Sequence, residues 1–174
     1  VYKYTSGSWD QHGSSIIGEY ICNYLGHSVS LSTDGKRVAV GATPYHSSLL
    51  IGSVPSYAVV YEYNDEGDNW VQLGSKMIGA SQITNSFTNG KPFNGWDQMG
   101  YSISLTADGS RLAVGAPYSS AESEIRGYRC GAVRIYDYDV TGDWVLMKEF
   151  IGHDPGGQFG FSISFSADGE ILAI

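Results

Sequence analysis

The chain has 174 residues, of which 42% are hydrophobic, and it carries a formal net charge of −8 at pH 7. This acidic balance argues against nucleic acid as a partner, because nucleic-acid recognition requires a basic surface. No apolar run approaches the roughly 20 residues that a membrane-spanning helix needs, so no membrane span is expected in this segment. The hydrophobic content is ample for a packed core.

Near-copies of one phrase divide the chain into modules. The copies are LGHSVSLSTDGKRVAVGATPY from Leu25, MGYSISLTADGSRLAVGAPY from Met99 and FGFSISFSADGEILAI from Phe159. A second, tyrosine-rich phrase recurs out of step with the first and leads to Trp9, Trp70 and Trp144. A repeat of roughly 60 residues predicts a modular array rather than one irregular domain.

Each module is expected to contain four strands. In the first strand, apolar residues alternate with serines from Ser28 to Ser32, and a period of two is typical of a strand. Asp34-Gly35 follows, and Asp-Gly between two apolar runs predicts a hairpin because glycine accepts a positive φ. The second strand is RVAVGA, and a variable loop leads to the tyrosine-rich third strand. A polar turn then leads to the fourth strand, which opens with the repeated tryptophan; no segment has a helical period.

The second face of these strands consists of serine, alanine and glycine rather than solvated polar residues. Small residues there predict burial of both faces, with the large face of one sheet against the small face of its neighbour. Four-stranded sheets repeated face to face about an axis describe a β-propeller. The expected fold class is therefore all-β, a β-propeller fragment built of four-stranded antiparallel blades. The alternatives are a stacked β-solenoid and a β-sandwich.

The repeat supplies about three blade-equivalents, fewer than the roughly four to eight blades of a complete propeller. We therefore expect a fragment of a longer protein, with closure of one blade between the two chain ends as the alternative. The segments are the second half of a blade with its link (1–24), a complete blade (25–79), a long inserted loop (80–98), a complete blade (99–152) and the first half of a further blade (153–174).

Three phrases resemble FG-GAP repeats, the blades of the integrin α-subunit propeller and of many secreted repeat proteins. They are FGFSIS from Phe159, VGAP from Val114 and GAVRIY from Gly131. The Ser-x-Asp-Gly pattern is also similar to WD40-like and TolB-type propellers. The resemblance to FG-GAP proteins implies a seven-bladed propeller outside the cell that binds protein or glycan partners and performs no chemistry.

The chain departs from that family at the turns that bind calcium. Calcium-binding FG-GAP blades carry Asp-x-Asp-x-Asp-Gly loops, because the ion needs several hard oxygen ligands. Here the turns at Asp34, Asp108 and Asp168 each hold one carboxylate, so we expect turn formers there and no cofactor. Other acidic residues lie between the third and fourth strands and are either candidate cation ligands at a loop tip or solvated turn residues: Asp65, Asp68, Asp139 and Asp143.

The sequence offers no candidate catalytic residues. The four histidines lack a zinc-type spacing, and His27 occupies a site filled by Tyr101 and Phe161 in the other copies, which indicates a packed aromatic substitute. No Gly-x-Ser-x-Gly nucleophile elbow is present. Repetition itself argues against an active site, because an active site is normally singular.

Aromatic residues outside the repeated positions are the candidate ligand- or partner-binding residues, because binding residues concentrate on loops held by a rigid scaffold. They are Phe87, Phe93 and Trp96 in the insertion, and Tyr118 and Tyr128 around the following variable loop. The repeated tryptophans are expected to brace the outer strand, with sugar stacking as the alternative. Cys22 and Cys130 either form a loop-to-loop disulfide or remain two buried thiols.

The leading hypothesis is a non-catalytic scaffold at the cell surface or outside the cell, acting in structure, adhesion or protein and glycan binding. One alternative is a segment of a propeller enzyme, of glycosidase or lyase type, whose catalytic residues lie in other blades. Another is a subunit of a surface filament or larger assembly, because unpaired strand edges at open module ends recruit other strands.

Overall fold

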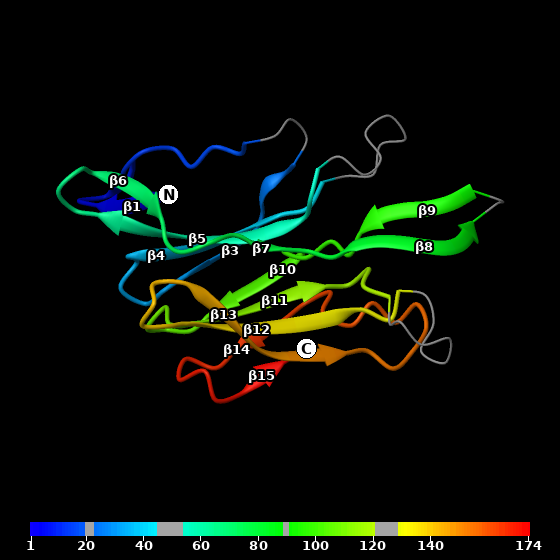
Figure 1. Cartoon of the computed structure of the whole chain (residues 1–174). Helices are drawn as coiled ribbons and strands as arrows, with labels where there is room; N and C mark the ends of the chain where they lie inside the picture. Colours follow the sequence, from blue (N-terminus) through cyan, green and yellow to red (C-terminus); the bar gives the residue numbers. More distant parts are fainter. Residues whose placement is uncertain (20–22, 45–53, 89–90, 121–128) are drawn as a thin grey trace.

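The computed structural model describes residues 1–19, 23–44, 54–88, 91–120 and 129–174. Within these ranges the chain forms strands and no helix, so none of the described segments is a helix able to cross a membrane. The strands form antiparallel sheets that lie in layers (Figure 1). The protein is therefore all-β, as predicted.

The first large sheet runs in chain order and forms from residues 25–78. Its members are β3 (Leu25–Leu31), β4 (Arg37–Ala42), β5 (Tyr57–Asn64), β6 (Asn69–Gln72) and β7 (Met77–Ile78). Strands β6 and β7 both pair with β5 and are separated at Gly74, whose φ of +71° interrupts the extended backbone. The fourth strand predicted here is thus present in two pieces.

The second large sheet repeats the arrangement without the interruption. Its members are β10 (Ser102–Leu105), β11 (Arg111–Ala116), β12 (Ala132–Tyr138) and β13 (Trp144–Ile151). They pair in chain order as a four-stranded sheet. At the first turn of both sheets, Gly35 and Gly109 adopt φ values of +69° and +70°. The hairpins predicted from Asp-Gly are therefore confirmed.

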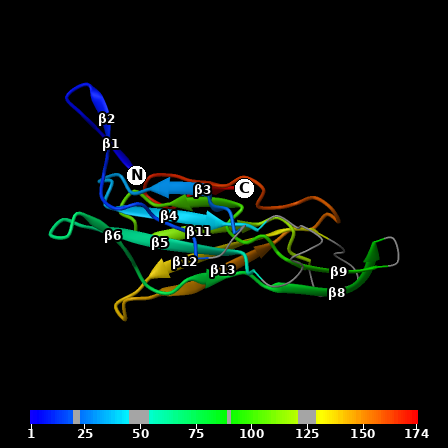
Figure 2. The ribbon, with the colours of Figure 1, turned by 90° about the horizontal axis from the view of Figure 1, so that it is seen from above.

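Two smaller hairpins lie at the outer layers of the stack. They are β1 (Tyr2–Thr5) with β2 (Ser8–Gln11), and β14 (Ser164–Phe165) with β15 (Leu172–Ala173). In the repeat, the first hairpin corresponds to the third and fourth strands of a large sheet, and the second hairpin to the first and second strands. The β1–β2 hairpin projects away from the large sheets (Figure 2).

The inserted segment was expected to be a loop, and this expectation is wrong for most of it. The chain forms an antiparallel hairpin of β8 (Ser81–Thr88) and β9 (Lys91–Trp96). The physical reason lies in the sequence between the two strands, Asn-Gly, which is among the strongest hairpin-forming pairs.

The serines of the first strands bond one module to the next. The hydroxyl of Ser28 donates to the carbonyl of Gly100 at 2.7 Å, and that of Ser102 donates to Gly160 at 2.7 Å. Ser30 Oγ accepts the backbone N–H of Leu105 at 3.0 Å, a contact repeated by Ser104 in the next module. The small face of the strands is therefore a polar seam between sheets rather than a solvated surface.

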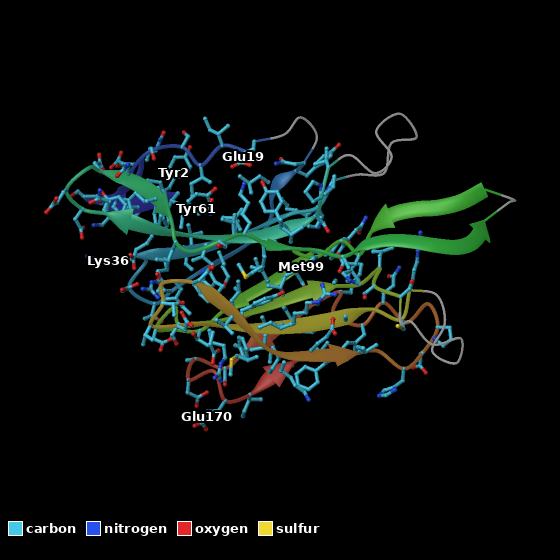
Figure 3. The ribbon with its side chains drawn as sticks, viewed as in Figure 1. Tyr2, Glu19, Lys36, Tyr61, Met99 and Glu170 are labelled. Atoms are coloured by element: carbon cyan, nitrogen blue, oxygen red, sulfur yellow. The ribbon has the colours of Figure 1, made fainter. Side chains whose placement is uncertain are left out.

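Apolar packing joins the two large sheets in the way the alternation predicts. The large residues Ile103 and Leu105 form one buried cluster with the small residues Ala39 and Ala58 of the first sheet. Met99 lies between the two sheets and is fully buried (Figure 3). Burial of both faces holds for β4 and β11 but fails at β3, where Val29 and Leu31 are 64% and 51% exposed.

The repeated tryptophans brace neighbouring modules. Trp70 donates its indole N–H to the carbonyl of His12 at 2.8 Å, and Trp144 donates to that of Leu73 at 2.9 Å. Both rings are buried, whereas Trp9 in the first copy is 68% exposed. The recurrence of one contact at one position supports the structural interpretation of these residues, because a ligand platform would not need the same backbone partner twice.

Removing one seam hydroxyl should weaken the fold measurably. We expect Ser28→Ala to lower the free energy of unfolding by about 1 kcal/mol, because the carbonyl of Gly100 loses its donor. Urea unfolding of the dilute protein measures the change. The matched control is Ser162→Ala, at the same repeat position but with an exposed side chain. Equal effects of the two substitutions would contradict the seam.

Candidate binding surface around the insertion hairpin

The β8–β9 hairpin extends beyond the end of the sheet stack, opposite the end where β1 and β6 lie (Figure 1). Its register places Phe93 opposite Thr84 and Phe87 opposite Pro92. Trp96 lies at the base, paired with Ser81. Three of the five predicted binding residues therefore stand on one hairpin, at positions that no other module repeats.

A buried carboxylate closes the base of this hairpin. Asp97 is fully buried, and its oxygens accept the backbone N–H groups of Ala80 at 3.0 Å and Met99 at 3.1 Å. Ser56 adds a hydroxyl donor at 3.2 Å. Because Ala80 and Met99 flank the insertion, one side chain holds both of its ends against the first sheet.

The charge of Asp97 is compensated from the second sheet. Arg134 on β12 lies with Nη1 2.7 Å from Asp97 Oδ2 and with Nε 2.8 Å from Glu149 Oε1. Burial is the largest single influence and would lower the pKa of Arg134, but the charge and the hydrogen bond of Asp97 together with the charge of Glu149 outweigh it, and the pKa is raised. Val59 takes the same register position in the first sheet, opposite Val40, so the ion pair is specific to the module with the insertion.

Tyr118 lies beside this base. Its backbone N–H donates to the carbonyl of Asp97 at 3.2 Å, which ties the loop after β11 to the insertion. The guanidinium of Arg129 lies 4.7 Å from the centre of the Tyr118 ring. We call Tyr118, Arg129 and the β8–β9 hairpin the insertion surface. Tyr128, the fifth predicted binding residue, lies outside the described residues.

The insertion surface combines an aromatic ring, a cation and an extended hairpin on a buried support. Such a surface can stack against a planar or apolar group. The sequence interpretation did not single out Asp97, Arg134 or Arg129. The sequence does carry a signal for two of them. Arg134 is a charged residue in an otherwise apolar strand, and Asp97, two residues before Met99, is equivalent to the polar residue Asn23 of the first copy.

Cys130 borders the same region. It is a buried thiol, free among the residues that the structure describes, and its Sγ lies 3.7 Å from the carbonyl of Ser119. Cys22 lies outside the described residues, so the pairing of the two cysteines stays a prediction.

The candidate cation ligands each contact protein donors in their own surroundings. Asp65 bonds Lys36 at 2.6 Å, and Asp68 accepts the hydroxyl of Tyr63 at 2.6 Å. Asp139 accepts the Thr141 N–H, and Asp143 accepts the Ser75 N–H at 2.6 Å. In the part of the chain that the structure describes, no group of three His, Cys, Asp or Glu side chains is arranged to hold a metal.

The Asp-Gly turns use their carboxylates within the turn. Asp108 accepts the N–H and the hydroxyl of Ser110 and the hydroxyl of Thr106. These bonds, with the Ser110 N–H first, lower the pKa of Asp108 to about 2. The turns at Asp34 and Asp168 repeat the arrangement, with Ser32 and Ser166 as the leading donors that lower each pKa.

His27 belongs to a ladder of aromatic rings. Its ring lies 4.7 Å from that of Tyr101, which in turn lies 4.7 Å from that of Phe161. The three rings come from the same position of three successive modules, so His27 serves as an aromatic substitute there, with its side chain exposed on the edge strand β3.

No protein-family model and no curated protein matches the chain. The site is therefore interpreted from its own residues.

Removing the cation beneath the hairpin should destabilise the protein strongly. We expect Arg134→Met to cost about 3 to 5 kcal/mol, because it leaves the Asp97 carboxylate buried without compensation. The double variant Asp97→Asn with Arg134→Met should recover a large part of this loss. Urea unfolding measures both, and a single variant as stable as the wild type would show that the pair does not support the fold.

The turn carboxylate predicts a pH dependence of stability. Since the pKa of Asp108 is lowered from 3.8 to about 2, its ionised form favours the folded state. Its contribution is complete above the unfolded pKa and is lost as the pH falls through 4 towards 2. Asp108→Asn should therefore lower stability at pH 6 and lose less stability than the wild type on acidification to pH 3. Parallel acid titration curves for the two proteins would contradict this.

Proposed function

We propose that the chain is a β-propeller repeat segment acting as a non-catalytic scaffold outside the cell, which presents the insertion surface to a protein or glycan partner. Structure, adhesion and partner binding are the roles that such a scaffold serves.

The contact from each first-strand serine to the next module's glycine carbonyl is the observation that carries the proposal. Ser28 and Ser102 make it with the same length and the same backbone partner in successive modules. Strand β10 approaches β3 on one side and β14 on the other, so neighbouring sheets meet through their first strands. Equal contacts repeated along first strands support a regular face-to-face arrangement of blades.

The repeated features support a structural rather than a chemical role. The turn carboxylates of Asp34, Asp108 and Asp168 accept hydrogen bonds within their own turns. The histidine that occupies a repeated position, His27, packs in the aromatic ladder. What varies between modules is the insertion, and the Asp97–Arg134 ion pair lies buried at its base. A variable element on a uniform framework favours recognition.

Arrays of glycans and of extracellular proteins, probed with the labelled 174-residue chain, test the proposal. We expect binding in one of the two classes, and Tyr118→Ala should weaken it by about 2 kcal/mol, or about 30-fold, if this ring is a central contact. The matched control is Tyr4→Ala, an exposed tyrosine on β1 at the other end of the stack. Binding that tolerates the loss of Tyr118, or turnover of an array glycan, would count against the proposal.

A further inference from the structure

The inserted hairpin differs in composition from the rest of the chain. Lys91 is the only charged residue between Ser81 and Trp96, whereas 16% of all residues are charged. The other polar residues of β8 and β9 are serine, threonine, asparagine and glutamine, and aromatic residues lie among them. Hydroxyl and amide groups both donate and accept hydrogen bonds, unlike a carboxylate or an ammonium group. The hairpin is therefore suited to an uncharged ligand that presents donors and acceptors together.

The register of the hairpin sorts these residues between two faces. Residues paired across an antiparallel ladder share a face, and successive residues of a strand alternate between faces. One face, which we call the polar face, holds Gln82, Thr84, Thr88, Lys91, Phe93 and Gly95. The other face holds Ser81, Ile83, Phe87, Pro92, Asn94 and Trp96. The shift of register after Thr84 does not disturb this division, because β9 is continuous across it.

Phe93 is the one aromatic residue of the polar face, and its neighbours in the register are polar or small. It lies opposite Thr84, with Gln82 on the diagonal and Gly95 two residues along the same strand. Glycine within a strand often marks the close approach of a ligand, because it has no side chain. A sugar has an apolar C–H face that packs on an aromatic ring and a rim of hydroxyl groups that bond amides and hydroxyls. A single aromatic residue among uncharged polar residues therefore fits a sugar.

The position of the hairpin suits an extended ligand. Among the described residues, β8 and β9 pair only with each other, and two views show them beyond the ends of β12 and β13 (Figure 1 and Figure 2). The two ends of the hairpin are fixed, because Asp97 accepts the N–H groups of Ala80 and Met99. Fixed ends lower the entropic cost of ordering the hairpin on a ligand. A ligand that runs along the strands can therefore be a chain of sugars.

A protein partner fits the polar face less well. The cores of protein interfaces are enriched in aromatic residues, methionine and arginine. The polar face offers Phe93 alone of these, whereas the other face carries Ile83, Phe87 and Trp96. A protein that binds the hairpin would therefore use the other face. The two classes of ligand predict dependence on different phenylalanines.

We infer that the polar face binds an uncharged glycan chain, in which one sugar ring stacks on Phe93 and bonds Gln82 and Thr84 through its hydroxyl groups. The inference rests on the proposed function, the recognition of a partner by the insertion surface, and it names the class of that partner. An uncharged ligand gains nothing from the attraction between opposite charges, so its binding should not respond to salt.

Arrays with three classes of probe test the inference: uncharged oligosaccharides, acidic oligosaccharides and extracellular proteins. The labelled wild-type chain should bind uncharged oligosaccharides, and a rise in salt concentration should leave this binding unchanged. Phe93→Ala should weaken it about tenfold through loss of the stacked ring, and Gln82→Ala about fivefold through loss of a hydrogen bond. Phe87→Ala, the same truncation on the other face, should weaken it by a smaller factor than Phe93→Ala.

The control is Phe161→Ala, which truncates an exposed phenylalanine of the third module and should bind like the wild type. Circular dichroism confirms that each variant is folded. Binding confined to proteins or to acidic oligosaccharides overturns the inference and leaves the proposed function standing. Equal losses from Phe93→Ala and Phe87→Ala overturn it as well. A chain that binds none of the three classes contradicts the proposed function and the inference together.

Discussion

The hydrogen bond from a first-strand serine to the next module's anchor glycine is the contact on which the architecture depends. It needs the serine hydroxyl and a close approach of the two sheets, which Gly41 and Gly115 permit because a Cβ at either position would clash with the carbonyl that accepts the bond. The same approach brings Ile103 onto Ala39, so polar and apolar contacts are satisfied together. The small residues therefore set the distance between neighbouring sheets, and the same distance recurs from module to module.

Much of this could be predicted from sequence because the information is local and repeated. Alternation of serine with apolar residues predicts the strands and the contact of their small face with a neighbouring sheet, and Asp108-Gly109 predicts a turn, in which the structure shows the carboxylate accepting the N–H of Ser110. The aromatic at the position of His27 is explained by its equivalents in the next two modules. Where the three copies agree in a residue or in its chemical class, that agreement shows which property the position requires.

The insertion could not be derived in the same way, because it has no second copy to compare. Its hairpin follows from Asn-Gly, but the support beneath it joins Asp97 to Arg134 across two sheets, a contact between residues 37 positions apart. Considered alone, Arg134 is an unexplained charge in an apolar strand, and Asp97 is an ordinary polar loop residue. Only their juxtaposition shows that each compensates the other, and such pairings depend on tertiary structure.

Because Asp97 closes the base of the insertion, the stability of the sheets does not depend on the shape of the hairpin. Both ends of the segment are held at Ala80 and Met99, so the intervening residues can change in length or composition while the chain enters and leaves at fixed points. A module with this arrangement can accept a different inserted hairpin, and the framework on either side need not adapt. The inserted segment can therefore diverge in sequence without any change to the repeated core.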